Sequence, residues 1–89
     1  MAVGDKTMFE IYRDAHNPAE VDVVYFTELE EHERDRVLAR IASAESIFRG
    51  FLRNETKDEA KRRIAELLAR REGDVDQNAV AVALAPYLA

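Results

Sequence analysis

The chain of 89 residues contains no cysteine, no tryptophan, three glycines and two prolines. The lack of cysteine excludes a disulfide framework and a zinc–thiolate site, and it fits a reducing compartment. The three glycines are isolated, so they cannot form a loop that cradles a phosphate. The only serines, Ser43 and Ser46, do not lie in a Gly-x-Ser-x-Gly turn. We therefore expect no enzymatic activity and no cofactor.

Long hydrophobic runs are also missing. The longest nearly uncharged stretch, residues 77–89, is too short for a transmembrane helix, and the N-terminus lacks the basic and apolar regions of a signal peptide. These features predict a cytoplasmic protein that does not insert into a membrane. Residues 1–7 are polar and without pattern, so we predict a flexible leader followed by a single domain over residues 8–89.

The net charge of −5 is unevenly distributed along the chain. Residues 1–35 contain ten acidic and three basic residues, a charge of −7, whereas residues 36–72 contain ten basic and six acidic residues, a charge of +4. Such a chain is either complementary within its own fold or presents one sign of charge to a partner. Ten of the thirteen basic residues are arginine, and with frequent alanine this indicates a gene of high GC content, of bacterial or phage type.

Two β-strands are predicted near the N-terminus. Residues 8–13 alternate, with Phe9 and Ile11 on one side, and residues 21–26 are rich in β-branched and aromatic side chains. Asn17 and Pro18 lie between them and favour a turn, because proline disfavours helical backbone in the preceding residue. We predict an antiparallel hairpin.

A first helix is predicted directly after the hairpin. Thr27 is a favourable N-cap, and Glu30 three residues later completes a capping box. Apolar residues then recur at helical spacing as far as Phe48, and Gly50 is the expected terminator. In a competing interpretation, residues 47–53 form a short third strand.

Two more helices are predicted in residues 56–85. Thr56 opens the first of them and Gly73 is its expected end, whereas Asp76 caps the last helix and Pro86 ends it. This last helix has almost no polar side, so it either packs in the core or forms an interface. The predicted fold class is therefore α+β: an N-terminal antiparallel β-hairpin followed by three α-helices around a single core.

Two surfaces are candidates for binding a partner. The second strand is apolar on both faces, and a hairpin of that kind needs cover. We expect one face to pack on the helices and the other to leave Tyr12, Val23 and Tyr25 for a partner or for a second copy of the chain. The acidic start of the first helix is the second candidate, because its charge would steer a basic partner. Its predicted binding residues are Glu28, Glu31 and Asp35.

Nucleic-acid binding is the alternative function, through the basic segment 49–71, which begins at Arg49 and ends at Arg71. Against it, the last helix has no arginine or lysine with which to read a major groove. Acids also stand four residues before bases, which favours ion pairs within one helix. These pairs are Asp58 with Arg62, Glu59 with Arg63, and Glu66 with Arg70.

Helical spacing would also bring Glu28, His32 and Asp35 to one face, as in a site for a divalent cation. An exposed charged helix explains the same pattern, and we predict no metal. The expected function is that of a small non-enzymatic protein–protein interaction module, which acts as a regulator, an inhibitor or an accessory subunit. Its expected partner is another protein or a second copy of the chain.

Overall fold

The protein is an α+β domain with an N-terminal antiparallel hairpin and three helices, as the sequence predicts. A computed structural model describes residues 6–70 and 75–89. Short 3-10 turns, η2, η3 and η4, occupy Phe26–Glu28, Asn54–Thr56 and Ala85–Tyr87. In chain order, the strands and α-helices are β1 (Lys6–Asp14), β2 (Val21–Tyr25), α1 (Glu31–Ala42), β3 (Ala44–Arg53), α2 (Lys57–Ala69) and α3 (Gln77–Leu84).

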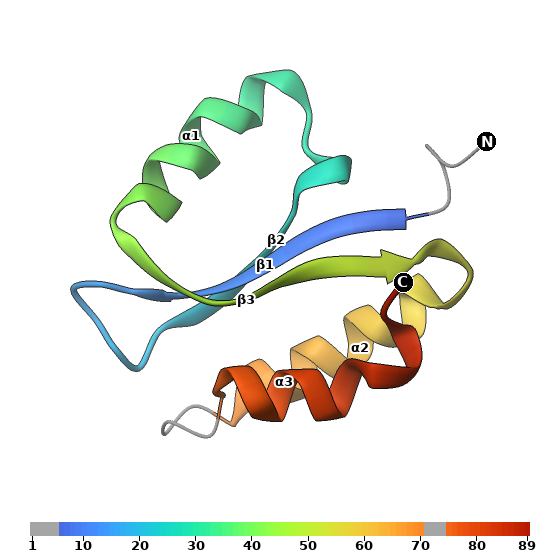
Figure 1. The fold of residues 1–89 in the computed structure, drawn as a ribbon. Helices are drawn as coiled ribbons and strands as arrows, with labels where there is room; N and C mark the ends of the chain where they lie inside the picture. The colour runs from blue at the N-terminus through green and yellow to red at the C-terminus, as the bar shows by residue number, and fades with distance from the viewer. Residues whose placement is uncertain (1–5, 71–74) are drawn as a thin grey trace.

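The three strands form one antiparallel sheet in the order β2-β1-β3, so that β1 is central. Helices α2 and α3 cover one face of the sheet, and α1 lies over the other (Figure 1). A β-bulge interrupts the pairing of β1 with β3, because Ile11 pairs with Phe48 whereas Tyr12 pairs with Ser46. Ile47 is the extra residue of this bulge, and its side chain is buried.

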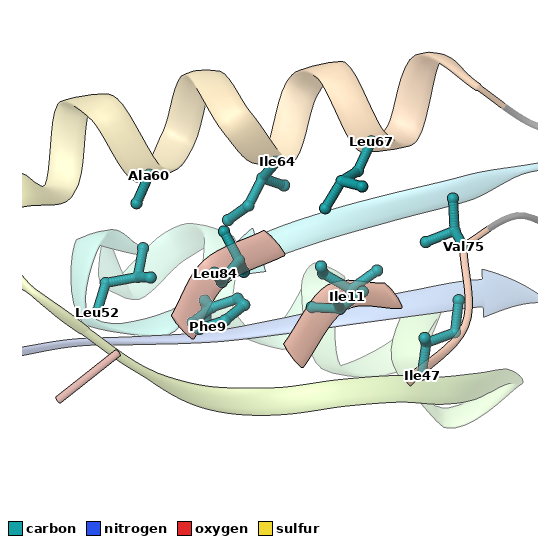
Figure 2. Packing of buried hydrophobic residues seen from close by; sticks show 10 residues of the cluster. Phe9, Ile11, Ile47, Leu52, Ala60, Ile64, Leu67, Val75 and Leu84 are labelled. Atoms are coloured by element: carbon teal, nitrogen blue, oxygen red, sulfur yellow. The ribbon is translucent and has the colours of Figure 1, made fainter. Parts of the chain in front are cut away.

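The hydrophobic core fills the space between the sheet and the pair α2 and α3 (Figure 2). Its centre is formed by Phe9 and Ile11, which project from the same face of β1 because side chains two residues apart share a face. Helix α2 contributes residues at helical spacing, and α3 contributes an i, i+4 pair. The remaining fully or nearly fully buried core residues are Ile47, Leu52, Ala60, Ile64, Leu67, Val75, Val80 and Leu84.

The third strand corrects the preferred interpretation, in which the first helix runs to Phe48 and Gly50 ends it. Helix α1 ends at Ala42 and β3 pairs along the whole of β1, so the competing interpretation of a third strand is correct, with an earlier start. Pairing with β1 outweighs the local helical pattern. Gly50 does not end a helix but leaves room in β3 for two aromatic rings, since an added Cβ would lie 3.1 Å from the Phe48 ring and 3.5 Å from the Phe9 ring.

Several predicted boundaries also shift. The N-cap of α1 is Glu30, whose backbone N–H donates to Glu33 at 3.1 Å in a capping box, and Thr27 lies in the turn before it. The N-cap of α3 is Asp76 as predicted, because its carboxylate accepts from the Ala79 N–H at 2.7 Å. Strand β1 begins at Lys6, two residues before the predicted domain boundary. The predicted helix end at residue 73 lies outside the described residues.

The one-sided core predicts a one-sided response to mutation. Ile64→Ala removes a fully buried side chain from α2 and should lower the free energy of unfolding by about 2–5 kcal/mol. Leu38→Ala in α1, where the side chain is 48% exposed, should cost less than about 1 kcal/mol. Urea denaturation monitored by circular dichroism measures both values. Equal losses would contradict a main core between the sheet and the pair α2 and α3.

Candidate functional site

The three residues of the predicted apolar surface do not lie together. In the hairpin register Ile11 pairs with Val23 and Phe9 pairs with Tyr25, so both β2 residues face α2 and pack against the core. Tyr12 pairs with Asp22 and projects from the opposite face, where it is only 6% exposed. The predicted surface of Tyr12, Val23 and Tyr25 is therefore wrong as a single face, because the register assigns its members to both sides of the sheet.

Tyr25 illustrates how α2 covers this strand. The ammonium of Lys61 lies 4.6 Å from the centroid of the Tyr25 ring, a cation–π contact. Burial, with a smaller effect of the nearby Glu28 charge, raises the pKa of the Tyr25 hydroxyl to about 12. The apolar face of β2 is thus already covered by the chain itself.

The predicted acidic surface is divided between an internal and an exposed role. Glu28 lies in the turn η2, and its carboxylate forms ion pairs with two ammonium groups of α2, that of Lys61 at 2.6 Å and that of Lys57 at 2.9 Å. The hydrogen bond from Lys61 is the main reason why the pKa of Glu28 is lowered. Glu31 and Asp35 are exposed on α1. Glu28 also reaches the surface, but its carboxylate is already paired with two lysines, so of the three predicted acids only Glu31 and Asp35 are without an ion pair in the described chain.

The metal site considered for Glu28, His32 and Asp35 has no geometric basis. Helix α1 begins at Glu31, so Glu28 is outside the helix and is directed to the lysines of α2. His32 lies 3.5 Å from Glu30 instead. Within residues 6–70 and 75–89, no group of three potential ligands is assembled.

The basic segment 49–71 is largely used in ion pairs inside the molecule. Arg49 contacts the buried carboxylate of Glu10 at 3.1 Å, and Arg53 contacts Glu55 at 3.0 Å. Together with Lys57 and Lys61, these residues are dispersed over the sheet and α2. Four basic residues of the described part of the segment thus already have acidic partners within the fold.

Helix α2 makes a different ion pair from those the sequence predicts. Arg63 contacts Glu66 at 3.0 Å, an i, i+3 pair, and none of the three predicted i, i+4 pairs forms among these described residues. Arg62 and Arg70 consequently have no ion-pair partner within residues 6–70 and 75–89. Both are exposed.

These two arginines border an open groove of about 730 Å³ between α2 and α3. One wall is apolar and comes from α3 and η4, where Val82 is 71% exposed. The other wall is charged and comes from α2. The lining residues are Glu59, Arg62, Arg63, Glu66 and Leu67 from α2, Arg70 directly after it, and Ala79, Val82, Ala83, Pro86 and Tyr87 from α3 and η4.

The groove was missed as a site, although the sequence carried a signal for it. The uncharged last helix was expected to pack in the core or to form an interface, and α3 does the first with Val80 and Leu84, both fully buried. Those two residues use only one side of the helix. The opposite side, with Val82, remains apolar and exposed, which a core role does not explain.

A smaller hollow of about 300 Å³ lies between α1 and the outer edge of β2. This edge is blocked by Asp22, whose Oδ1 accepts the Val23 N–H at 2.8 Å. The other carboxylate oxygen of Asp22 accepts from Arg40 at 3.1 Å, which tethers α1 to the strand. On the opposite edge of the sheet, the N–H of Ala89 donates to the Phe51 carbonyl at 2.9 Å. Neither edge is therefore open along its whole length.

Glu28→Gln removes the carboxylate that joins η2 to α2 and should make stability less dependent on pH. The pKa of Glu28 is lowered from its usual 4.5, so its contribution is complete above that pH and is lost as the pH falls through the lowered value. We expect the variant to be less stable by up to about 1 kcal/mol at pH 7, and equally stable near pH 2. Urea titrations at both pH values measure the difference, with Glu31→Gln as the control. A deficit that persists at the lower pH would contradict the ion pair.

Asp22→Ala should expose the edge of β2. Loss of the carboxylate frees the Val23 N–H, whose hydrogen exchange we expect to become about fivefold faster. Arg40→Ala is the matched control, because it releases α1 but keeps the carboxylate at Val23. Exchange measured by NMR separates the two variants. Equal exchange of Val23 in wild type and Asp22→Ala would show that the side chain does not block the edge.

No helix within residues 6–70 and 75–89 has the length and apolar character needed to cross a membrane. The chain matches no protein-family model, no curated protein and no solved structure.

Proposed function

We propose that this chain is a non-enzymatic protein-binding module, a regulator, inhibitor or accessory subunit, which docks a helical segment of another protein between α2 and α3. The observation that carries the proposal is the open groove with one apolar and one charged wall. Amphipathic helices bind in grooves of this kind through apolar residues at helical spacing.

The apolar wall supports a helix as the docked element. Ala79 and Ala83 are one turn apart on α3, and their small side chains allow a second helix to approach closely. Val82 stands beside them and is the most exposed of the large hydrophobic residues in the described chain. An exposed β-branched residue in an uncharged helix is a suitable apolar anchor, because a partner would bury most of its surface.

Nucleic-acid binding is less well supported by the same groove. Its arginines lie opposite an apolar wall from α3, which a phosphate backbone cannot cover. The other basic residues of the segment, from Arg49 to Lys61, are engaged with Glu10, Glu55 and Glu28. A gel-shift assay with long DNA and RNA at low salt distinguishes the two functions, and a clear shift would favour the alternative.

A photo-crosslinking amino acid at position 82, in the full chain and in the native host, tests the proposal. We expect a defined crosslinked protein from position 82 and none from position 38 in α1, which is also exposed. Val82→Glu should weaken binding of that protein at least about tenfold, because a charge would face the apolar contact. Leu38→Glu is the matched control and should bind normally.

Circular dichroism should show the same fold for both glutamate variants, since both positions are exposed. Capture of the same protein by Val82→Glu and by wild type with equal affinity would contradict docking in the groove.

A further inference from the structure

We infer that the segment docked in the groove is an acidic amphipathic helix, with two carboxylates about two turns apart that pair with Arg62 and Arg70. The inference rests on the proposed function and specifies the chemistry of its partner. Three observations lead to it: the arginines that lack partners, their spacing along α2, and the apolar wall opposite them.

The first observation concerns two exposed arginines that form no ion pair in the described chain. Glu66 lies one turn from both Arg62 and Arg70, yet its carboxylate binds Arg63 at 3.0 Å. Both neighbouring guanidinium groups are therefore left without an ion-pair partner in the described chain. Guanidinium groups bind carboxylates with two parallel hydrogen bonds, which makes them suited to acidic side chains of a partner.

The second observation is the spacing. Arg62 lies in α2, and Arg70, eight residues later, is the C-cap residue and keeps helical backbone angles, so the two are about 12 Å apart along the helix axis. A second helix that lies along the groove repeats the same rise per residue. Carboxylates seven or eight positions apart on that helix therefore meet both arginines at once, whereas an extended peptide spans the same distance in about four residues.

The third observation is the contrast between the two walls. The α3 wall has no charge, so the partner must present apolar side chains there and acidic ones toward α2. Glu59, near the N-terminus of α2, adds a repulsive element. A third acid at that end would be disfavoured, and the carboxylate pair is expected toward the C-terminal two-thirds of α2.

A second copy of the chain fits this groove less well. Its own amphipathic helix, α1, carries three acidic and three basic residues, so it has no net charge. Free phosphates and nucleic acids lack the apolar face that the α3 wall requires. An acidic helix of another protein satisfies both walls.

Two fluorescent 16-residue helical peptides test the inference. Both have a leucine and alanine stripe; one carries two glutamates eight positions apart beside the stripe, and the other carries glutamines there. Fluorescence anisotropy with the full chain should show about fivefold tighter binding of the acidic peptide at low salt. High salt should remove that preference.

The double variant Arg62→Gln/Arg70→Gln should bind both peptides equally, whereas Arg36→Gln, an exposed change on α1, should keep the preference. Val82→Glu should weaken the binding of both peptides. Equal binding of the two peptides to wild type, or no binding of the acidic peptide, would overturn the acidic helix. If Val82→Glu leaves the binding of both peptides unchanged, docking in the groove is contradicted as well. Self-association of wild type that Val82→Glu abolishes would identify a second copy as the occupant.

Discussion

The structure depends on the burial of one face of the central strand. Phe9 and Ile11 are fully buried beneath α2 and α3, and β2 and β3 pair with β1 on either side. The inner faces of α2 and α3 are committed to this contact, which explains why Ile64 and Leu84 are also fully buried. The groove on the outer side of these two helices is therefore lined by elements that the core positions.

The opposite face of the sheet is organised differently. Helix α1, which is described along its whole length, contains no buried residue, and Leu38 is 48% exposed. A polar contact, Arg40 with Asp22, connects it to the sheet, and beneath it Glu10 is buried against Arg49. Exposed ion pairs contribute little to stability. The fold therefore has a firmly packed side that carries the groove and a weakly packed side that carries the exposed acids of α1.

Local signals in the sequence predict much of this fold. The alternation around Phe9 and the cap at Asp76 identify a strand and a helix start, because both depend on neighbours in the chain. For residues 44–53 the local pattern favours helix and turn, with a third strand over residues 47–53 only as the competing interpretation, since strand character there comes from pairing with β1, which is distant in sequence. The sequence predicts less well which face of the sheet each side chain of the hairpin occupies, because this depends on the register between the strands. Tyr12 is on the other side of the sheet for that reason.

The distribution of charge also draws attention to the groove between α2 and α3. The excess of acid near the N-terminus and of base after it is partly complementary inside the fold, because Glu28 binds Lys57 and Lys61. Sequence spacing also predicted that acids of α2 would satisfy its arginines. Instead Glu66 pairs with Arg63, and Arg62 and Arg70 have no partner within the described residues. Two exposed arginines without an ion-pair partner in the described chain therefore stand beside the apolar wall of α3, and these two features together are the basis of the proposed acidic helical partner.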